Sequence, residues 1–278
     1  MFNLAQPHLK KFAARRIGAT VQLDNTLAEV FHENTKLTPL TSRAYGMRIN
    51  QVTQNPIMKS LFEQPYKVYS LVDREELAGG AARNEVERSI LARRSERNYT
   101  GEPVTREELS RLLYFSYGLT GPGRYRAVAS GGALYPLEIY VFALRVEGLD
   151  AGIYHYDVEH HSLDAIERRD RSTELAEAVY FDTIDLDRTA LVVVITALFQ
   201  RTTIKYLDRG YRLILMEAGE VIQNLSLMVE SLGLGGCALG GFQDDSLSHL
   251  LGINGVDEAP LVPFTVGRLP RKRKEGAA

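Results

Sequence analysis

The chain has 278 residues, 45% of them hydrophobic and 24% charged, so it is long enough to bury a full core as one large domain or two modest ones. Its 33 basic and 35 acidic residues leave a formal charge of -2, which excludes a global attraction to nucleic acid or to an anionic membrane. The single cysteine excludes an intrachain disulfide, and the lack of an apolar run near ~20 residues and of a signal-peptide core predicts a cytoplasmic protein with no membrane partner.

Residues 1–84 are predicted to form an N-terminal extension that packs onto a main domain of residues 85–278. A helical pattern covers residues 26–32 of this extension. Three prolines follow, which we expect to break regular structure: Pro39, Pro56 and Pro65. The glycine- and alanine-rich stretch 77–82 marks a hinge before the main domain.

Two helices open the main domain. The first covers residues 85–94. The second begins at Thr105, which forms the T-x-x-E capping box with Glu108, and ends at Gly118.

Strands follow these helices. Residues 138–144 are rich in β-branched and aromatic side chains, and residues 152–163 have the alternating pattern of a hairpin. Residues 190–196 are continuously apolar, which predicts a central strand covered on both faces. One more strand is predicted at 261–266.

The pattern at 213–232 predicts a long amphipathic helix, because its apolar residues recur at three- and four-residue steps. So long a stripe suits burial against a sheet, a second subunit, or both. A short helix is predicted at 245–251. Helices interspersed with short strands indicate an α+β fold with a mixed or antiparallel central sheet flanked by helices.

Three islands carry residues suited to chemistry. Arg93, Arg94, Ser95 and Arg97 offer three guanidinium groups that match a phosphate, although a solvated basic helix face is the more common meaning of such a run. The glycines in Ser130-Gly131-Gly132 let backbone amides approach a ligand, although such a string is more often a plain turn.

The third island is the pair Lys205 and Tyr206, which precedes the long helix. Lys-Tyr is a common dipeptide, so on its own it indicates a solvated loop. Gly240 and Gly241 form a similar case, in which a tight turn and a ligand-facing loop are equally consistent with the residues.

Taken in order, these islands resemble the SagB/McbC-type azoline dehydrogenases, which are flavin enzymes of the nitroreductase-like superfamily. The matching strings are R-x-S-x-R at 93–97, S-G-G-A-L-Y-P at 130–136 and a Lys-Tyr pair ahead of R-G-Y-R at 209–212. The resemblance covers about residues 85–270 and implies a nitroreductase-like FMN-binding fold that is dimeric, with each flavin site shared between two subunits.

The resemblance also implies roles for individual residues. The catalytic pair is Lys205 and Tyr206: a base takes the acidic Cα proton of an azoline ring while hydride leaves the neighbouring carbon for the flavin. A lysine acts as such a base only in its uncharged form, which needs burial or a neighbouring cation. The implied FMN-binding residues are Arg93, Arg94, Ser95, Arg97, Ser130, Gly131, Gly132, Leu134, Gly240, Gly241 and Arg268.

The remaining polar residues have simpler interpretations. Glu217 and Asn224 lie on or near the apolar stripe and are interpreted as satisfied helix-packing groups. Three histidines are expected at exposed hairpin positions and not in a metal site: His155, His160 and His161. The string His32-Glu33-Asn34-Thr35-Lys36 resembles an H-E-x-T-K stretch of SagB-type proteins but names no role.

The predicted function is FMN-dependent oxidation of thiazoline or oxazoline rings to thiazole or oxazole in a ribosomally synthesised peptide. The expected partners are the azoline-containing peptide, a second copy of the chain and proteins of a cyclodehydratase complex. Two alternatives stay open: an NAD(P)H-dependent nitro- or quinone-reductase, and a non-catalytic FMN-containing scaffold subunit of a cyclodehydratase complex.

Overall fold

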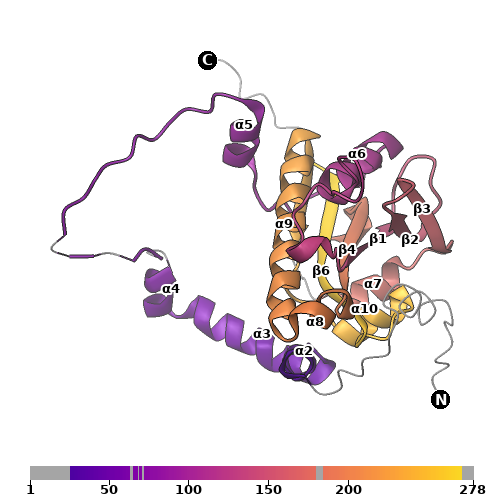
Figure 1. Ribbon diagram of the computed structural model, residues 1–278, viewed down its shortest axis with the longest axis horizontal. Helices are drawn as coiled ribbons and strands as arrows, with labels where there is room; N and C mark the ends of the chain where they lie inside the picture. Colours follow the sequence, from indigo (N-terminus) through magenta and orange to yellow (C-terminus); the bar gives the residue numbers. More distant parts are fainter. Residues whose placement is uncertain (1–25, 63–64, 68, 71, 180–183, 271–278) are drawn as a thin grey trace.

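The computed structural model describes residues 26–62, 65–67, 69–70, 72–179 and 184–270, so residues 1–25 of the predicted extension lie outside the described ranges. At its centre lies a sheet with the strand order β3-β2-β1-β4-β6-β5 (Figure 1). The strands are β1 (Leu137–Ala143), β2 (Gly152–Asp157), β3 (Ser162–Glu167), β4 (Leu191–Leu198), β5 (Leu234–Ala238) and β6 (Glu258–Arg268). Every pairing between neighbours in this order is antiparallel.

Helices surround this sheet, and the predicted α+β class is confirmed. The helices are α2 (Leu27–Thr35), α3 (Pro39–Gln54), α4 (Pro56–Phe62), α5 (Glu85–Ala92), α6 (Arg106–Tyr117), α7 (Ser172–Ala178), α8 (Gln200–Tyr206), α9 (Arg209–Ser231) and α10 (Asp244–Leu251). Two short 3-10 turns are η1 (Gly131–Ala133) and η2 (Leu186–Arg188).

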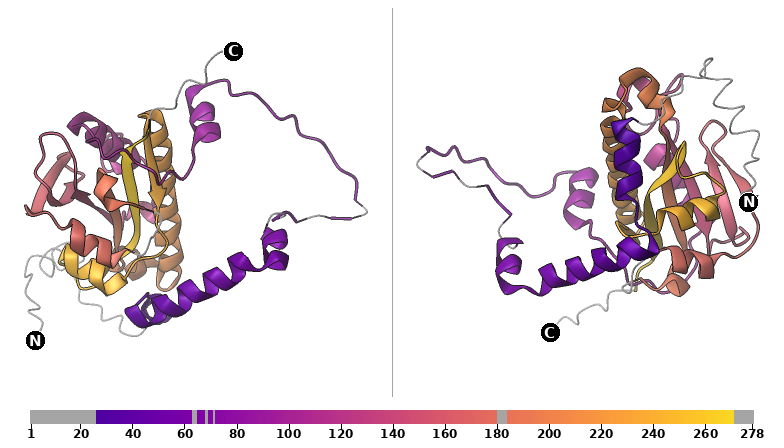
Figure 2. Two further views of the ribbon diagram at one scale, coloured as in Figure 1. Left: turned by 180° about the vertical axis from the view of Figure 1, so that it is seen from behind. Right: turned by 90° about the horizontal axis from the view of Figure 1, so that it is seen from below.

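Helices cover both faces of β4, which lies between β1 and β6. Val193 belongs to the core under α6 and α9, whereas Val192 and Val194 belong to the core under α7 and α10. Figure 2 shows this three-layer arrangement from two further sides. The prediction of a central strand buried on both faces is therefore confirmed.

The long helix α9 spans 23 residues and packs against the sheet through the predicted apolar stripe. Its buried residues include Ile214, Val221 and Leu225. The helix begins at Arg209, four residues before the predicted start at 213, and Gly233 follows its end with a φ of 68°. A left-handed glycine is a common helix C-terminal signal because it carries no Cβ.

Local patterns predicted two further elements correctly. The Thr105 hydroxyl accepts a hydrogen bond from the Glu108 amide at 3.1 Å, and the Glu108 carboxylate accepts one from the Thr105 amide at 2.8 Å, so the capping box starts α6. The predicted hairpin at 152–163 is formed by β2 and β3.

Two prolines of the N-terminal part differ from their prediction. Pro39 and Pro56 do not interrupt helices but are the first residues of α3 and α4, where the missing amide proton costs nothing. No residue of α3 is buried, and α3, α4 and the segment after them reach away from the sheet (Figures 1 and 2). Packing onto the main body is seen for α2 and the residues directly after it.

Candidate functional site

The loop at 130–136 has a backbone conformation that is costly to hold. Gly132 has a φ of 69°, and two residues with a Cβ also lie in the left-handed region, Ala133 at 53° and Tyr135 at 48°. Non-glycine residues avoid this region because the Cβ crowds the following carbonyl. Surrounding contacts must therefore hold the loop in place.

Several side chains hold this loop. The Ser130 hydroxyl accepts from the Tyr135 amide at 2.9 Å, and Arg201 Nη1 donates to the Tyr135 carbonyl at 3.1 Å. Arg201 also pairs with Glu138 at 2.5 Å, and both side chains are mostly buried. The Arg126 guanidinium lies 4.8 Å from the centre of the Tyr135 ring. Together these contacts fix the loop to the start of β1 and to α8.

Gly132 is the point at which this loop meets Lys205 and Tyr206. A Cβ on Gly132 would lie 2.6 Å from the Tyr206 hydroxyl and 2.8 Å from Lys205 Nζ, so both side chains would have to shift to admit one, and the φ of 69° itself favours glycine. Lys205 Nζ itself lies 5.0 Å from the centre of the Tyr206 ring. The structure thus brings together two of the three sequence islands, which lie about seventy residues apart in the chain.

The Lys-Tyr pair lies at the end of a helix and not in the loop that its sequence suggests. Lys205 and Tyr206 are the last residues of α8, which ends where Leu207 takes a φ of 49°. Arg201, one turn earlier on α8, makes the contacts to Glu138 and Tyr135 already described. The same short helix therefore carries the pair and an anchor for the loop.

Glu217 lies beneath the loop and has an unusual environment for a carboxyl group. It is 2% exposed, accepts a hydrogen bond from the Tyr117 hydroxyl at 3.1 Å and also hydrogen-bonds to Ser130. Burial raises the pKa of Glu217 to about 7, because a carboxylate is poorly stabilised away from water. The sequence signals for this residue are its polar character within an apolar stripe and its place in an M-E-x-G string that resembles the family's helix pattern.

Asn224 is a helix-packing group, as predicted. Its side-chain amide donates to the carbonyls of Ser116 at 3.4 Å and Ala127 at 3.2 Å, which ties α9 to the end of α6 and to the loop after it. These bonds satisfy a polar side chain among apolar neighbours.

Residues 93–97, here called the arginine segment, lie along β5. The Glu96 amide donates to the Gly236 carbonyl at 3.0 Å, and the side chains of Ser95 and Arg97 hydrogen-bond to the Cys237 thiol. Arg94 donates to the carbonyls of Leu91 and Arg93 at the end of α5. Within the described ranges, none of the arginines of this segment forms an ion pair with a carboxylate. Such uncompensated guanidinium groups fit a phosphate.

The other predicted cofactor residues have different surroundings. Arg268 is engaged with its own chain, because it pairs with Glu108 at 2.8 Å and donates to the Pro103 carbonyl at 3.0 Å. Gly240 is exposed, and no atom lies within 4 Å of the position of a Cβ there. Gly241 is buried and Leu134 is half-buried.

The arginine segment lies toward one end of α9, and Gly132 with Lys205 and Tyr206 lies toward the other. Gly131 packs against Leu213 in the first turns of α9, whereas the arginine segment follows α5 and pairs with β5, which comes directly after the last turn. Figure 1 shows α8 at one end of α9 and α5 beside the other. The helix is about 35 Å long at 1.5 Å per residue.

The histidines partly contradict their prediction. His155 is not at an exposed position: it is half-buried and its Nε2 lies 2.8 Å from the Glu138 carboxylate. Burial alone would lower the pKa of His155, but the hydrogen bond and charge of Glu138 raise it. His160 and His161 are exposed as predicted. In the described part of the chain, His, Cys, Asp and Glu side chains form no group of three that could hold a metal ion.

Comparison with known proteins identifies the family of this chain. Residues 90–268 match the model of the nitroreductase family. The chain belongs to the nitroreductase family. Members of this family typically bind FMN, and the predicted fold is confirmed by the solved structures below. Within the described ranges, no helix combines the length and the apolar character needed to cross a membrane.

Three related proteins share sequence with part of this chain. It is 41% identical over 179 residues to a nitroreductase-type protein of Methanocaldococcus jannaschii, which covers 64% of this chain and 88% of the relative. It is 28% identical over 159 residues to the microcin B17-processing protein McbC of Escherichia coli, and 30% identical over 154 residues to the trifolitoxin-processing protein TfxB of Rhizobium leguminosarum bv. trifolii. These two matches span 58% and 41% of the peptide-processing proteins.

Solved structures give the same fold. A nitroreductase-type protein of Anabaena variabilis is 32% identical with a TM-score of 0.58, over 66% of this chain and 38% of that chain. A chain of the E. coli microcin synthetase McbBCD complex with truncated pro-MccB17 bound is 20% identical with a TM-score of 0.63, over 95% of this chain and 92% of that chain.

Proposed function

We propose that this nitroreductase-family enzyme uses FMN to oxidise azoline rings to azoles in a ribosomally synthesised peptide. The observation that carries the proposal is the closeness of Gly132 to Lys205 Nζ and to the Tyr206 hydroxyl. In the family that the sequence resembles, the glycine loop contacts the flavin and the Lys-Tyr pair carries the chemistry. Here one chain places both at a single point.

The reaction removes two electrons and two protons from each ring. One hydrogen leaves the ring as a proton and the other as hydride, and FMN supplies the acceptor for the hydride when it is bound. Lys205 is exposed in the single chain, so the burial that a lysine base needs must come from the bound flavin, the peptide or a second chain. In this proposal Lys205 then takes the Cα proton, and the Tyr206 hydroxyl beside it orients or relays that proton. The loop with Gly132 would hold the pair in place beside the bound flavin.

The described residues fit FMN at both ends of the cofactor. Arg93 and Arg97 provide guanidinium groups that no carboxylate of the described part neutralises, and a phosphate carries the matching charge. Gly240 presents backbone without a Cβ, and the space beside it is open, whereas the Cβ side of Gly132 is occupied by Lys205 and Tyr206. Arg268 would have to leave Glu108 to bind the cofactor, so we assign it to that ion pair instead.

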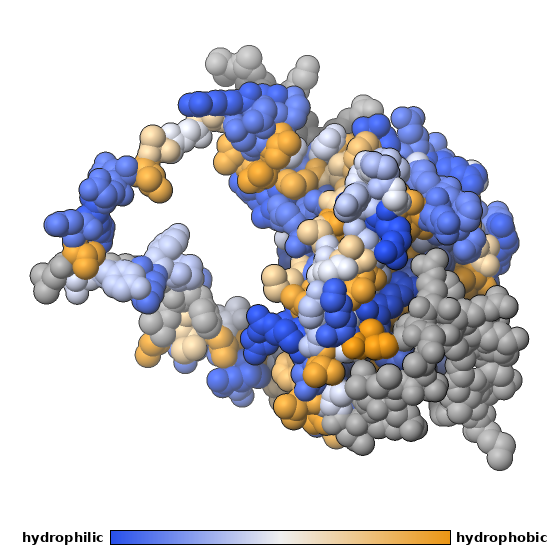
Figure 3. Space-filling view, in the orientation of Figure 1, coloured by the Kyte–Doolittle hydropathy of each residue, from blue (hydrophilic) through white to orange (hydrophobic). Residues whose placement is uncertain are grey.

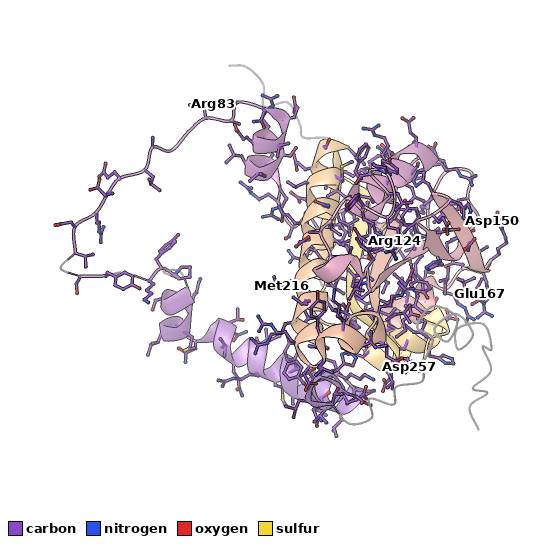
Figure 4. The ribbon with its side chains drawn as sticks, in the orientation of Figure 1. Arg83, Arg124, Asp150, Glu167, Met216 and Asp257 are labelled. Atoms are coloured by element: carbon purple, nitrogen blue, oxygen red, sulfur yellow. The ribbon has the colours of Figure 1, made fainter. Side chains whose placement is uncertain are left out.

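A shared site explains why the two groups lie toward opposite ends of α9. One flavin that uses both the arginine segment and the Gly132 loop requires two chains in antiparallel arrangement. Apolar side chains are exposed on α5 and on the outer face of α9, including Val86, Ile90 and Met216 (Figure 3). Met216 lies on the side of α9 that is turned toward α3 and α4 (Figure 4). A homodimer that covers these residues is therefore part of the proposal.

The peptide substrate is supported by McbC and TfxB, both named as peptide-processing proteins. A second candidate function, reduction of nitro or quinone compounds by NAD(P)H, is supported by the 41% identity to the M. jannaschii relative over 88% of its length.

Anaerobic flavin reduction separates the two functions. The purified flavoprotein is mixed either with a thiazoline-containing peptide or with NADH or NADPH, and flavin absorbance is followed. We expect the peptide to bleach the flavin and to lose about two hydrogen masses per ring, a change that mass spectrometry detects. Bleaching by a nicotinamide alone, with the peptide unchanged, would overturn the proposal in favour of the reductase.

A further inference from the structure

The helix that carries Lys205 and Tyr206 cannot hold its own position. α8 has seven residues and no side-chain cap at its start, and it ends at the left-handed Leu207. Helices this short are marginal in water, because nucleation costs more than so few hydrogen bonds return. Contacts with other elements must therefore set where the Lys-Tyr pair lies.

α2 contacts the chain at both ends of α8. Before α8 begins, the Phe199 ring lies 4.9 Å from the His32 ring in an edge-on arrangement. After α8 ends, the Ala28 amide donates to the Asp208 carboxylate at 3.0 Å. His32 Nδ1 also lies 3.2 Å from the Tyr211 hydroxyl.

His32 therefore packs on a pair of rings that flank α8. Phe199 and Tyr211 stack on each other with ring centres 5.7 Å apart, and the His32 ring meets both. Because these two residues bracket α8, a side chain that holds both also fixes the helix between them.

The other residues of the H-E-x-T-K string hold α2 itself. Lys36 Nζ is buried, donates to the Gly255 carbonyl at 2.8 Å and pairs with Glu33 at 2.7 Å. Directly after α2, the Leu37 amide donates to the Asp244 carboxylate at 2.8 Å. α2 is thus fixed to α10 and to the turn after it, independently of its contacts with α8.

The neutral form of His32 suits this place. The side chain is 7% exposed, and its Nε2 is buried without a hydrogen-bond partner among the described residues. A neutral imidazole that carries its proton on Nδ1 donates to Tyr211 and leaves no N–H without an acceptor.

We propose that His32 is a positioning residue that locks α8 so that Lys205 and Tyr206 stay against Gly132. The catalytic consequence rests on the proposed function, whereas the locking of α8 does not. This gives the H-E-x-T-K string a defined structural role, in which its histidine docks on the rings around α8 while its glutamate and lysine anchor the helix that carries it.

Hydrogen exchange of the α8 amides tests the lock without any substrate. In wild-type protein, the Leu207 amide donates to the Thr203 carbonyl at 2.7 Å and should be protected. His32→Ala should speed exchange across 203–207 by about tenfold or more, with β4 amides unchanged. His32→Asn, which keeps a polar atom near the place of Nδ1, should restore part of the protection, and Val30→Ala on the exposed side of α2 should change nothing.

The same variants then test catalysis. We expect His32→Ala to lower kcat by about tenfold with KM and bound FMN near wild-type values, and His32→Asn to recover part of the loss. Tyr211→Phe supplies an independent removal of the hydrogen bond and should give a smaller change in the same direction. Wild-type exchange in α8 of both His32→Ala and Tyr211→Phe would overturn the proposal. If exchange changes as expected while Lys205→Ala retains activity, the proposed function fails but the lock stands.

Discussion

Gly132 combines a left-handed backbone conformation with close contact to Lys205 and Tyr206. An alanine there would take a φ of 69° at a cost of about 1–2 kcal/mol and place its Cβ against Lys205 and Tyr206. We expect Gly132→Ala to lower turnover at least about tenfold, because the pair must move, and to lower the melting temperature slightly. Gly46→Ala is the control, since no atom lies within 4 Å of its Cβ position. Wild-type turnover in Gly132→Ala would show that the contact has no catalytic role.

Glu217 makes stability depend on pH. Its pKa rises from the usual 4.5 to about 7 on folding, so between these values the folded chain holds more protons than the unfolded chain. Stability therefore falls as pH rises from 4.5 through 7, by at most about 3 kcal/mol from this group. The Glu217→Gln side chain cannot titrate, so the variant does not lose this stability as pH rises. The difference in free energy of unfolding, variant minus wild type, should therefore be larger at pH 8 than at pH 4.5. Urea unfolding at the two pH values measures the difference, and an equal difference at both would contradict a raised pKa.

At the scale of elements, the tie between α8 and the glycine loop depends on Arg201. Arg201→Ala removes the ion pair with the mostly buried Glu138 and the bond to the Tyr135 carbonyl. We expect a loss of about 3 kcal/mol in the free energy of unfolding, because Glu138 keeps its charge and, among the described residues, only His155 as an ionic partner. Arg168→Ala breaks the exposed pair with Asp150 and should cost less than about 1 kcal/mol. Equal losses in the two variants would contradict a structural role for Arg201.

Elements with a strong local signal could be predicted from the sequence. α9 and β4 have apolar patterns long enough to identify their type and burial, and α6 is marked by a complete capping box. α8 could not be predicted, because seven residues with no cap and no clear stripe leave only tertiary contacts to make them helical. The expectation that Pro39 and Pro56 break regular structure is wrong, because a proline breaks a helix from within but favours its first turn.

For the site, the sequence predicts the motifs but not the contacts between them. The strings around Ser130 and Lys205 are visible in the chain, yet their contact through Gly132 depends on β1 and β4 being neighbours in the sheet. Glu217 and Arg201 were not predicted as parts of the site, because one resembles a packing residue and the other a surface arginine until their partners are known.

At the scale of the whole molecule, the flavin site should depend on a second chain. Met216 is 62% exposed on α9, and a carboxylate there would be costly to bury in a dimer interface. We expect Met216→Glu to give a folded monomer that loses its flavin on dialysis, because the proposed site takes residues from both subunits. Ile166 is 48% exposed on β3, at the sheet edge opposite β5, the strand that follows α9. Ile166→Glu should therefore remain dimeric and yellow. Analytical ultracentrifugation with flavin absorbance checks both, and a monomer that retains FMN would contradict the shared site.

The central claim is that Lys205 takes a proton from an azoline ring beside a bound flavin. Single-turnover flavin reduction by an azoline peptide tests it most directly, with bound FMN quantified first in the wild type and in Lys205→Ala. Loss of a general base typically costs about 10²–10⁴ in rate, so we expect a loss in that range with FMN content unchanged. Lys205→Arg should recover little, because a guanidinium stays protonated. Flavin reduction at the wild-type rate in Lys205→Ala would contradict the account.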